Sequence, residues 1–234
     1  MENKRLLKIT DLTIGHEGRT LCSGISFEIC EGDCIMLCGA NGSGKTTLMK
    51  ALAGKENSSC IRYEAGCECI MIPARIPKVA GFTLREFVRI SCFSKSDLYG
   101  KLSREEESAM DQAINDLGLK HLTDRDISTL SDGEFQKAGI ASALVRKASV
   151  IMLDEPTAFL DAQNRISVLN TLRDICQRKA ADTHMPAVVF STHDLHDGLQ
   201  ACSKVFAIGA DGQFHISLED TPESKSAAVA AIFR

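Results

Sequence analysis

The sequence predicts an α/β fold in which buried strands alternate with helices along the chain. Two apolar runs carry this prediction: Cys34–Cys38, which leads into a glycine-rich loop, and Val150–Leu153, which ends in two adjacent carboxylates. Short, continuously apolar segments are typical of parallel strands that are buried on both faces. Helix-starting patterns fill much of the stretch between the two runs. Strands that alternate with helices in this way indicate an α/β core.

The first third of the chain is expected to consist mainly of strands. An antiparallel pair comes first, because two segments of alternating hydrophobicity flank the turn-like residues 16–19, and it would form an N-terminal β-subdomain. The helix after the glycine-rich loop is expected to close at Gly54, a residue type common at helix ends. The expected elements are strands over Lys8–Ile14, Ile25–Ile29, Cys34–Cys38 and Glu68–Ile72, and a helix over Lys45–Ala53.

The middle of the chain is expected to be a helical insert, about residues 78–147, within a single domain that spans residues 1–234. Its helices start at capping boxes, in which Ser or Thr is followed three positions later by Glu. Such boxes begin at Thr83, Ser103 and Ser131. The helix of the third box is expected to end near Arg146.

Strands and helices alternate again in the last third. The final two strands flank Asp211-Gly212, a dipeptide that indicates a hairpin. Asp161 is a suitable N-cap for the first helix of this part. The expected elements are strands over Val150–Leu153, Ala187–Ser191, Val205–Gly209 and Gln213–Leu218, and helices over Ala162–Lys179, Leu195–Cys202 and Ser226–Phe233.

The composition excludes some classes of protein. The 234 residues carry a net charge of −4, which argues against a general nucleic-acid binder with a basic face. No run of about 20 apolar residues is present, so direct insertion into a membrane is not expected. The first residues lack the apolar core of a signal peptide, which predicts a cytoplasmic protein. Any role at a membrane would therefore depend on a partner.

The ten cysteines do not form a recognisable metal motif. No CxxC pair occurs, and no Cys/His spacing fits a zinc site. Cys34 and Cys38 lie in an apolar strand, where reduced cysteine acts as a small hydrophobic residue. Cys67 and Cys69 form a CxC pair, which is a weak indication of metal or redox chemistry. The preferred interpretation of the cysteines is structural.

The glycine-rich loop has the spacing of a nucleotide phosphate loop. Gly39 is followed after four residues by Gly44-Lys45-Thr46, between a strand and a helix. Backbone N–H groups and the helix N-terminus would bind the phosphates of ATP. Lys45 would bridge the β- and γ-phosphates, and the Thr46 hydroxyl would be a Mg²⁺ ligand. The expected nucleotide-binding residues are Gly39, Ala40, Asn41, Gly42, Ser43, Gly44, Lys45, Thr46 and Thr47. The alternative is an ordinary glycine-rich turn.

The two carboxylates after Val150–Leu153 suit a catalytic site. Asp154 would hold Mg²⁺ directly or through water, and Glu155 would polarise the water that attacks the γ-phosphate. Alone, such a pair could be an acidic strand end that faces solvent. Beside a phosphate loop, the catalytic interpretation is favoured.

A third short stretch, Leu130-Ser131-Asp132-Gly133-Glu134, lies between these two. The three stretches in this order resemble the nucleotide-binding subunit of an ATP-binding cassette (ABC) transporter, over about residues 7–218. The resemblance implies a P-loop NTPase core with an N-terminal antiparallel β-subdomain and an inserted helical subdomain. It also implies that Ser131, Gly133 and Glu134 belong to a signature segment that contacts the γ-phosphate held by a second copy of the chain. Asp132 and Glu134 replace the more usual Gly and Gln, and the same residues would also serve as an ordinary helix cap.

Three more residues take roles from this resemblance. His193, which follows the strand that ends at Ser191, matches the switch histidine that contacts the γ-phosphate. Asp161 matches the aspartate that communicates between the two sites of a dimer. His16 stands where the family usually has an aromatic residue that stacks on adenine, so it is the candidate for that contact.

The loop after Ile72 departs from the family pattern. ABC subunits usually carry a Gln there, which helps to place magnesium and the attacking water and contacts the membrane partner. This chain has Pro73-Ala74-Arg75 instead. A methyl group cannot ligate a cation that requires oxygen. We therefore expect slow basal hydrolysis but normal ATP affinity.

The resemblance implies an ATPase that works as a homodimer bound to integral-membrane permease subunits, peripheral on the inner face of the cell membrane. The segment Leu130–Asp161 looks most like the subfamily that serves importers of iron–siderophore complexes, haem and cobalamin. Three alternatives remain: the ATPase of another ABC system such as a haem exporter, a soluble ABC ATPase without a transport role, and a cassette that binds ATP without turnover.

Overall fold

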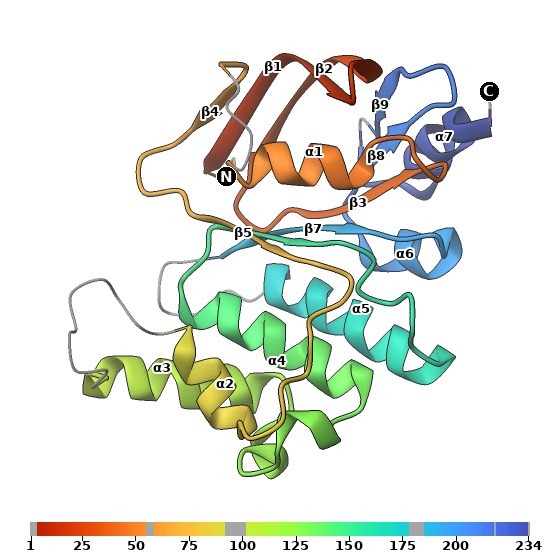
Figure 1. The fold of residues 1–234 in the computed structure, drawn as a ribbon. Coiled ribbons are helices and arrows are strands. Elements are labelled where there is room, and N and C mark those ends of the chain that lie inside the picture. Colours follow the sequence, from red (N-terminus) through yellow and green to blue (C-terminus); the bar gives the residue numbers. More distant parts are fainter. Residues whose placement is uncertain (1–3, 55–58, 92–101, 178–184, 218, 234) are drawn as a thin grey trace.

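Two sheets and a set of packed helices build the fold (Figure 1). The computed structural model describes the chain except for residues 1–3, 55–58, 92–101, 178–184, 218 and 234.

Among the described residues, the larger sheet has six strands in the order β5-β6-β7-β3-β8-β9. Neighbouring strands from β5 to β8 pair in parallel, whereas β9 is antiparallel to β8. The strands are β3 (Cys34–Gly39), β5 (Cys69–Ile72), β6 (Val150–Leu153), β7 (Ala187–Ser191), β8 (Lys204–Ile208) and β9 (Phe214–Ile216). Every residue of β3, β6 and β7 is buried, which confirms the prediction from their apolar runs.

The smaller sheet is antiparallel, with the order β2-β1-β4. It consists of β1 (Arg5–His16), β2 (Arg19–Cys30) and β4 (Ile61–Tyr63). The first two strands extend beyond the predicted ranges. β4 was not predicted, because it lies in a stretch that looked irregular from its polar sequence. It forms by pairing Ile61–Tyr63 with Leu7–Ile9, a contact between segments far apart in the chain.

The larger sheet separates two hydrophobic clusters, because successive residues of a strand point to opposite faces. Ile35 and Leu37 of β3 pack on the side of the small sheet and α1 (Lys45–Leu52). Met36 and Cys38 pack on the opposite side, where the other helices lie. Each large side chain buried in this way contributes about 1.5–3 kcal/mol.

The helices below the sheet in Figure 1 cover the second face, and the first three of them, α2 to α4, lie within the range expected for the helical insert. They are α2 (Leu84–Ile90), α3 (Arg104–Asp116), α4 (Asp132–Val145), α5 (Ala162–Gln177) and α6 (Leu195–Ala201), with short 3₁₀ turns at Lys120–Leu122 and Ile127–Thr129. The three predicted capping boxes are confirmed. The backbone N–H groups of Thr83, Ser103 and Ser131 donate to Glu86, Glu106 and Glu134 over 2.8, 2.8 and 2.7 Å respectively.

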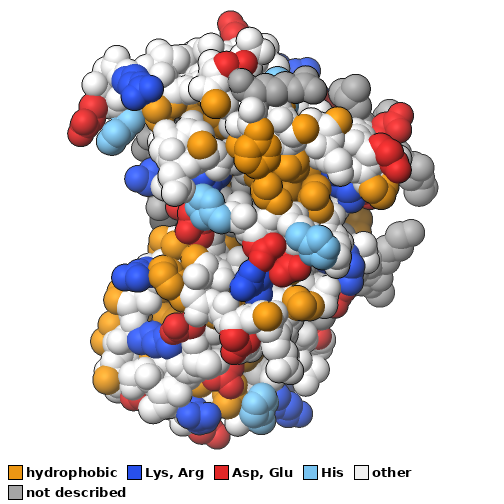
Figure 2. All heavy atoms as spheres, turned by 90° about the vertical axis from the view of Figure 1, so that its right-hand side faces the viewer, with side chains coloured by type: hydrophobic (Ala, Val, Ile, Leu, Met, Phe, Trp, Pro, Cys, Tyr) orange, Lys and Arg blue, Asp and Glu red, His pale blue; other side chains and the backbone are white. Residues whose placement is uncertain are grey.

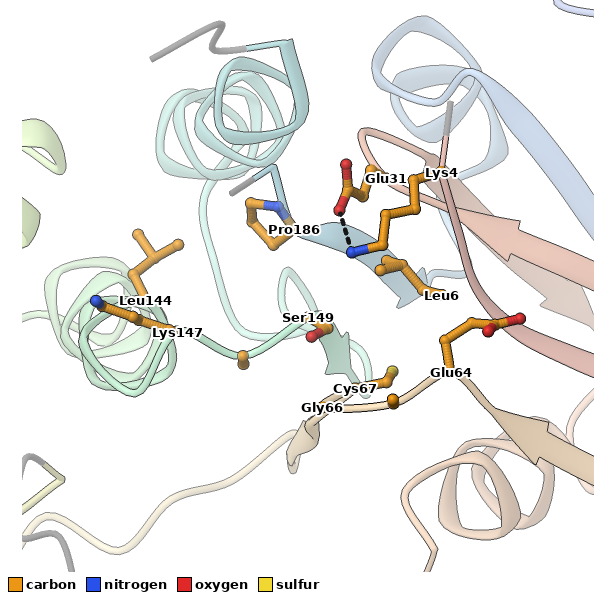
Figure 3. Close-up of a pocket in the computed structure, with 12 residues that line it drawn as sticks. Lys4, Leu6, Glu31, Glu64, Gly66, Cys67, Leu144, Lys147, Ser149 and Pro186 are labelled. Atoms are coloured by element: carbon orange, nitrogen blue, oxygen red, sulfur yellow. Dashed lines mark ion pairs between the residues drawn. The ribbon is translucent and has the colours of Figure 1, made fainter. Parts of the chain in front are cut away.

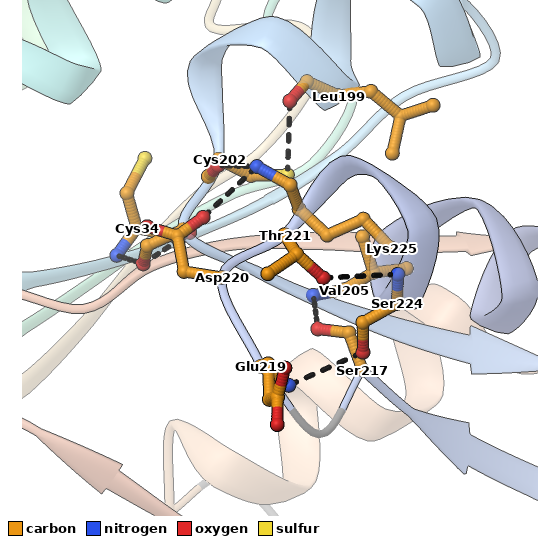
Figure 4. A network of polar contacts seen from close by, with 11 residues as sticks. Cys34, Leu199, Cys202, Val205, Ser217, Glu219, Asp220, Thr221, Ser224 and Lys225 are labelled. Carbon is orange, nitrogen blue, oxygen red and sulfur yellow. Dashed lines mark hydrogen bonds and ion pairs between the residues drawn. The ribbon is translucent and has the colours of Figure 1, made fainter.

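The C-terminal helix α7 (Pro222–Ala230) starts four residues earlier than predicted and is followed by a 3₁₀ turn at Ala231–Phe233. The Thr221 side chain caps it by accepting a hydrogen bond from Ser224 N over 3.3 Å. Lys225 then anchors the helix to the segment before β8, because its Nζ donates to Cys202 O and to Asp220 Oδ1, each over 3.0 Å (Figure 4).

Within the described ranges, no helix combines the length and the apolar character needed to cross a lipid bilayer.

Candidate nucleotide-binding site

The phosphate loop connects β3 to α1, and its glycines are required by the backbone. Gly42 and Gly44 have φ values of 76° and 106°, in the left-handed region that other residues rarely adopt. A Cβ on Gly44 would also lie 2.9 Å from Ile14 Cδ1. Glycine therefore allows β1 to pack against the loop. Because α1 begins directly at Lys45, its free N–H groups and partial positive charge face the loop.

Lys45 bridges the loop from inside. Its Nζ donates to Gly39 O over 2.9 Å and to Ala40 O over 3.0 Å, and the residue is only 6% exposed. Burial lowers the pKa of Lys45, whereas the nearby carboxylates of Glu155 and Asp154 act in the opposite direction. The buried Ser43 Oγ has no hydrogen-bond partner within the described part of the chain. A buried amine and an unsatisfied hydroxyl in one loop fit a bound phosphate.

Asp154 directly follows β6 and contacts residues of α1 and β7. Its Oδ2 accepts a hydrogen bond from Thr46 Oγ1 over 2.8 Å, and its Oδ1 accepts one from Ser191 Oγ, also over 2.8 Å. Thr46 and Asp154, the two residues expected to serve Mg²⁺, are thus in direct contact. A hydroxyl and a carboxylate are the hard oxygen donors that this cation prefers.

Glu155 is held in an unusual backbone conformation. Its φ is 46°, rare for a residue with a side chain and typical of functional sites. Its N–H donates to Ser191 Oγ over 2.8 Å, and its Oε1 lies 2.8 Å from His193 Nε2. Ser191 therefore connects the Asp154 carboxylate to the Glu155 backbone. The sequence indicated it only as a neighbour of His193, although a polar residue at the end of a buried strand was a usable signal.

The signature residues lie apart from this network. Ser131, Gly133 and Glu134 form the start of α4, and no hydrogen bond joins them to the phosphate loop in the parts of the chain described. Lys78 contacts two other residues of the same segment, because its Nζ donates to Leu130 O and to Asp132 Oδ1, each over 2.7 Å.

Asp161 and His16 also lie outside the network. Asp161 accepts hydrogen bonds from Asn164 N over 2.8 Å and from Asn164 Nδ2 over 2.9 Å, which lower its pKa. It therefore caps α5, as predicted. His16 lies at the end of β1 with its side chain 74% exposed, and its Nε2 is 3.8 Å from Glu17 Oε1.

Ala74 lines a cavity of about 580 Å³ that also contacts Glu155 and α4. The sequence did not reveal a contact on its rim: the Arg75 guanidinium lies 4.4 Å from the centroid of the Phe159 ring. This cation–π contact joins the loop after β5 to the segment after Glu155. Phe159 remains 54% exposed, so this rim can also contact another molecule.

Figure 2 shows the side of the molecule at the right of Figure 1. Acidic, basic and histidine side chains are interspersed there with hydrophobic patches. This face does not present a continuous basic surface of the kind that binds nucleic acid.

Comparison with known proteins agrees with this geometry. The ABC transporter family profile matches residues 22–158. The zinc import ATP-binding protein ZnuC of Agrobacterium fabrum is 28% identical over 226 residues, which cover 96% of this chain and 70% of ZnuC. The ferric enterobactin transport ATP-binding protein FepC of Escherichia coli K12 is 26% identical over 220 residues, which cover 88% of this chain and 79% of FepC.

One solved structure is similar over nearly the whole chain. It is an inward-facing conformation of a metal-chelate type ABC transporter, with a TM-score of 0.81 and 25% identity, and the similarity covers 97% of this chain and 89% of that one. The phosphate loop, the paired carboxylates and these similarities lead to one conclusion: the chain belongs to the ABC transporter family, as an ATP-binding subunit with ATPase activity.

Proposed function

We propose that the chain hydrolyses Mg-ATP at composite sites in a homodimer and that this reaction powers a metal-chelate importer. The observation that carries the catalytic part is a continuous set of contacts from the phosphate loop to His193. It runs through Thr46, Asp154, Ser191 and Glu155.

Lys45 and the loop N–H groups bind the phosphates in this proposal. The Lys45 amine already lies inside the loop, so on binding it exchanges two carbonyl partners for phosphate oxygens. Thr46 and Asp154 hold Mg²⁺, which supplies charge neutralisation on the phosphate oxygens. The hydrogen bond between Thr46 Oγ1 and Asp154 Oδ2 keeps these two oxygens next to each other.

Glu155 acts as the general base. Its backbone N–H is fixed by Ser191, and its carboxylate is fixed by His193, so the carboxylate is aimed before substrate binds. His193 can turn from Glu155 to the γ-phosphate, which leaves the carboxylate free to polarise water. His16 stacks on adenine from the exposed end of β1.

The second half of each site comes from another copy of the chain. The start of α4 carries Ser131, Gly133 and Glu134. Among the described residues, no hydrogen bond joins these three to the phosphate loop. The N-terminus of α4 suits a phosphate, and Asp161 lies at the start of the adjacent α5. A dimer in which each signature faces the partner's γ-phosphate uses both features.

The permease contact is proposed for the rim formed by residues 73–82 and Phe159. Several large apolar side chains are exposed there: Val79, Phe82 and Phe159. A subunit docked in this way is peripheral on the inner face of the membrane. Residues 1–234 act as one ATPase domain with a helical insert at about 78–147.

The proposed cargo class is an iron chelate of the siderophore, haem or cobalamin type. Its support is the likeness to FepC and to the metal-chelate transporter. ZnuC, a zinc importer subunit, is similarly related, so the identity of the permease decides the cargo. Co-purification of the tagged chain from detergent extracts, followed by mass spectrometry, tests this directly. A partner permease of an exporter, or a purely soluble partner, would contradict the importer assignment.

Glu155→Gln tests the catalytic assignment. A general base contributes about 10²–10⁴-fold, so steady ATP hydrolysis should fall at least roughly 100-fold while ATP binding persists. The measurements are steady-state ATPase activity and equilibrium nucleotide binding. Glu107→Gln, at an exposed position in α3, is the matched control and should keep wild-type activity. Near-normal hydrolysis by Glu155→Gln would remove Glu155 from the role of base.

A further inference from the structure

Two thiols at the start of β5 differ from the chain's buried cysteines. Burial raises the pKa of Cys38 and of Cys202 to about 12, so these thiols are inert. Cys67 and Cys69 are only partly buried, and their Sγ atoms lie 3.9 Å apart. Residues two apart in an extended segment point to the same side. The two thiols therefore face each other across Glu68 at hydrogen-bond distance.

Cys67 is accessible from a cavity. It lines a space of about 530 Å³ near the amino ends of β5 and β6. Figure 3 shows its side chain next to Ser149, with the Lys4–Glu31 ion pair nearby. This cavity lies outside the set of residues assigned to ATP, so no role in hydrolysis accounts for the thiols.

The two thiols are chemically unequal. The hydrogen bond from Cys69 lowers the pKa of Cys67, and Ser149 acts in the same direction, while burial opposes both. The hydrogen bond to Cys67 and burial raise the pKa of Cys69. Cys67 is thus the more readily deprotonated of the two thiols, and the thiolate is the nucleophilic form of cysteine.

The intervening residue is firmly held. Glu68 O accepts hydrogen bonds from Ser149 N over 2.8 Å and from Val150 N over 3.1 Å, and its carboxylate pairs with Arg146. This attachment keeps the thiols on the same side of the segment. Within the described ranges, no group of three or more His, Cys, Asp or Glu side chains is arranged to hold a metal ion.

We propose that Cys67 and Cys69 form a reversible dithiol–disulfide pair that is oxidised by small hydroperoxides. The Cys67 thiolate attacks the terminal peroxide oxygen and the O–O bond breaks, which gives a sulfenic acid and an alkoxide that takes up a proton to become an alcohol. The Cys69 sulfur then attacks the Cys67 sulfur, the S–O bond breaks, and water leaves with the Cys69 proton. In sum, two thiols and one hydroperoxide give one disulfide, one alcohol and one water.

The bond should also be easy to reduce. Two extended residues span about 6.6 Å, near the upper end of the Cα separation that a disulfide accepts. Strained disulfides have higher reduction potentials and are the labile ones. A dithiol reductant should therefore restore the thiols without unfolding the protein.

A tryptic peptide provides a clean test. Cleavage after Arg62 and Arg75 releases residues 63–75, whose only cysteines are Cys67 and Cys69. The folded protein is treated with hydrogen peroxide at a small molar excess, alkylated at low pH and digested. We expect this peptide to resist alkylation and to be lighter by two hydrogen atoms, and dithiothreitol should reverse the change. Oxidation of Met71 adds oxygen and is thereby distinguished.

Matched variants separate the two roles. Cys69→Ser should leave a Cys67 sulfenic acid that dimedone captures, whereas Cys67→Ser should leave Cys69 unreactive at the same peroxide dose. Cys60→Ser changes another partly buried cysteine and should keep the wild-type disulfide. Circular dichroism establishes that each variant is folded. Full alkylation of both cysteines after peroxide treatment, or a disulfide to another peptide, would overturn the proposal.

Discussion

At the scale of single residues, the site depends on one serine that the sequence did not single out as functional. Ser191 donates to Asp154 and accepts from the backbone of Glu155, so it fixes the Asp154 carboxylate relative to the Glu155 backbone. It can do this because it ends a fully buried strand beside β6. The spacing of sequence motifs predicts which residues meet the phosphates. It does not predict which hydroxyl in a neighbouring strand will join them.

Ala74 provides a prediction at this scale. It shares a cavity with Glu155 but offers only a methyl group. Ala74→Gln would supply an amide that can orient the attacking water, so we expect hydrolysis to rise by up to about tenfold, equivalent to about 1.4 kcal/mol in the barrier. ATP affinity should change little, since phosphate contacts dominate it. Steady-state ATPase activity at saturating Mg-ATP is the measurement.

Ala80→Gln is the matched control for this experiment. It adds the same side chain to an exposed position of the same connecting segment, away from Glu155, and should leave the rate unchanged. An unchanged rate in Ala74→Gln, or a rise in both variants, would show that the loop is wrongly aligned with the family pattern.

At the scale of elements, helix starts were the most predictable feature. All three capping boxes are formed, because each needs only residues within four positions of one another. β4 and the start of α7 were not predicted. β4 depends on pairing with β1, a distant segment, so no local pattern predicts it. The start of α7 does carry a local signal that the prediction overlooked, because Thr221 caps the helix and Pro222 lies in its first turn.

The second capping box allows a prediction of stability. Ser103→Ala removes the side-chain acceptor of Glu106 N and should lower the free energy of unfolding by about 1 kcal/mol. Ser108→Ala, inside the same helix and exposed, should not destabilise, because alanine is the better helix former there. Chemical denaturation of both variants measures the difference. Equal stabilities would mean that the cap does not contribute.

At the scale of the whole molecule, the separation of the signature from the phosphate loop is the basis for the proposed second copy. Ser131→Arg places a bulky cation at the N-terminus of α4, so it should lower ATPase activity at least about tenfold by blocking the composite site. ATP binding to the monomer should persist. Light scattering in the Glu155→Gln background, with and without ATP, should show that the arginine also prevents ATP-driven dimerisation.

Ser108→Arg, on exposed α3, adds the same charge and should keep both activity and dimerisation. If Ser131→Arg instead abolished ATP binding to the monomer, the signature would be acting within its own chain.

Lys78 lies in the loop after β5 and contacts the signature segment at the start of α4. It therefore links two separate elements of the fold. Asp132 and Glu134 both add a negative charge to the first turn of α4, where a phosphate is expected to approach. The Lys78 ammonium neutralises the first of these charges from the loop after β5. A displacement of that loop by a docked permease would withdraw the ammonium and leave the carboxylate uncompensated. The permease could thereby tune the electrostatic attraction between the two halves of the dimer, using charge alone and without deforming the helix.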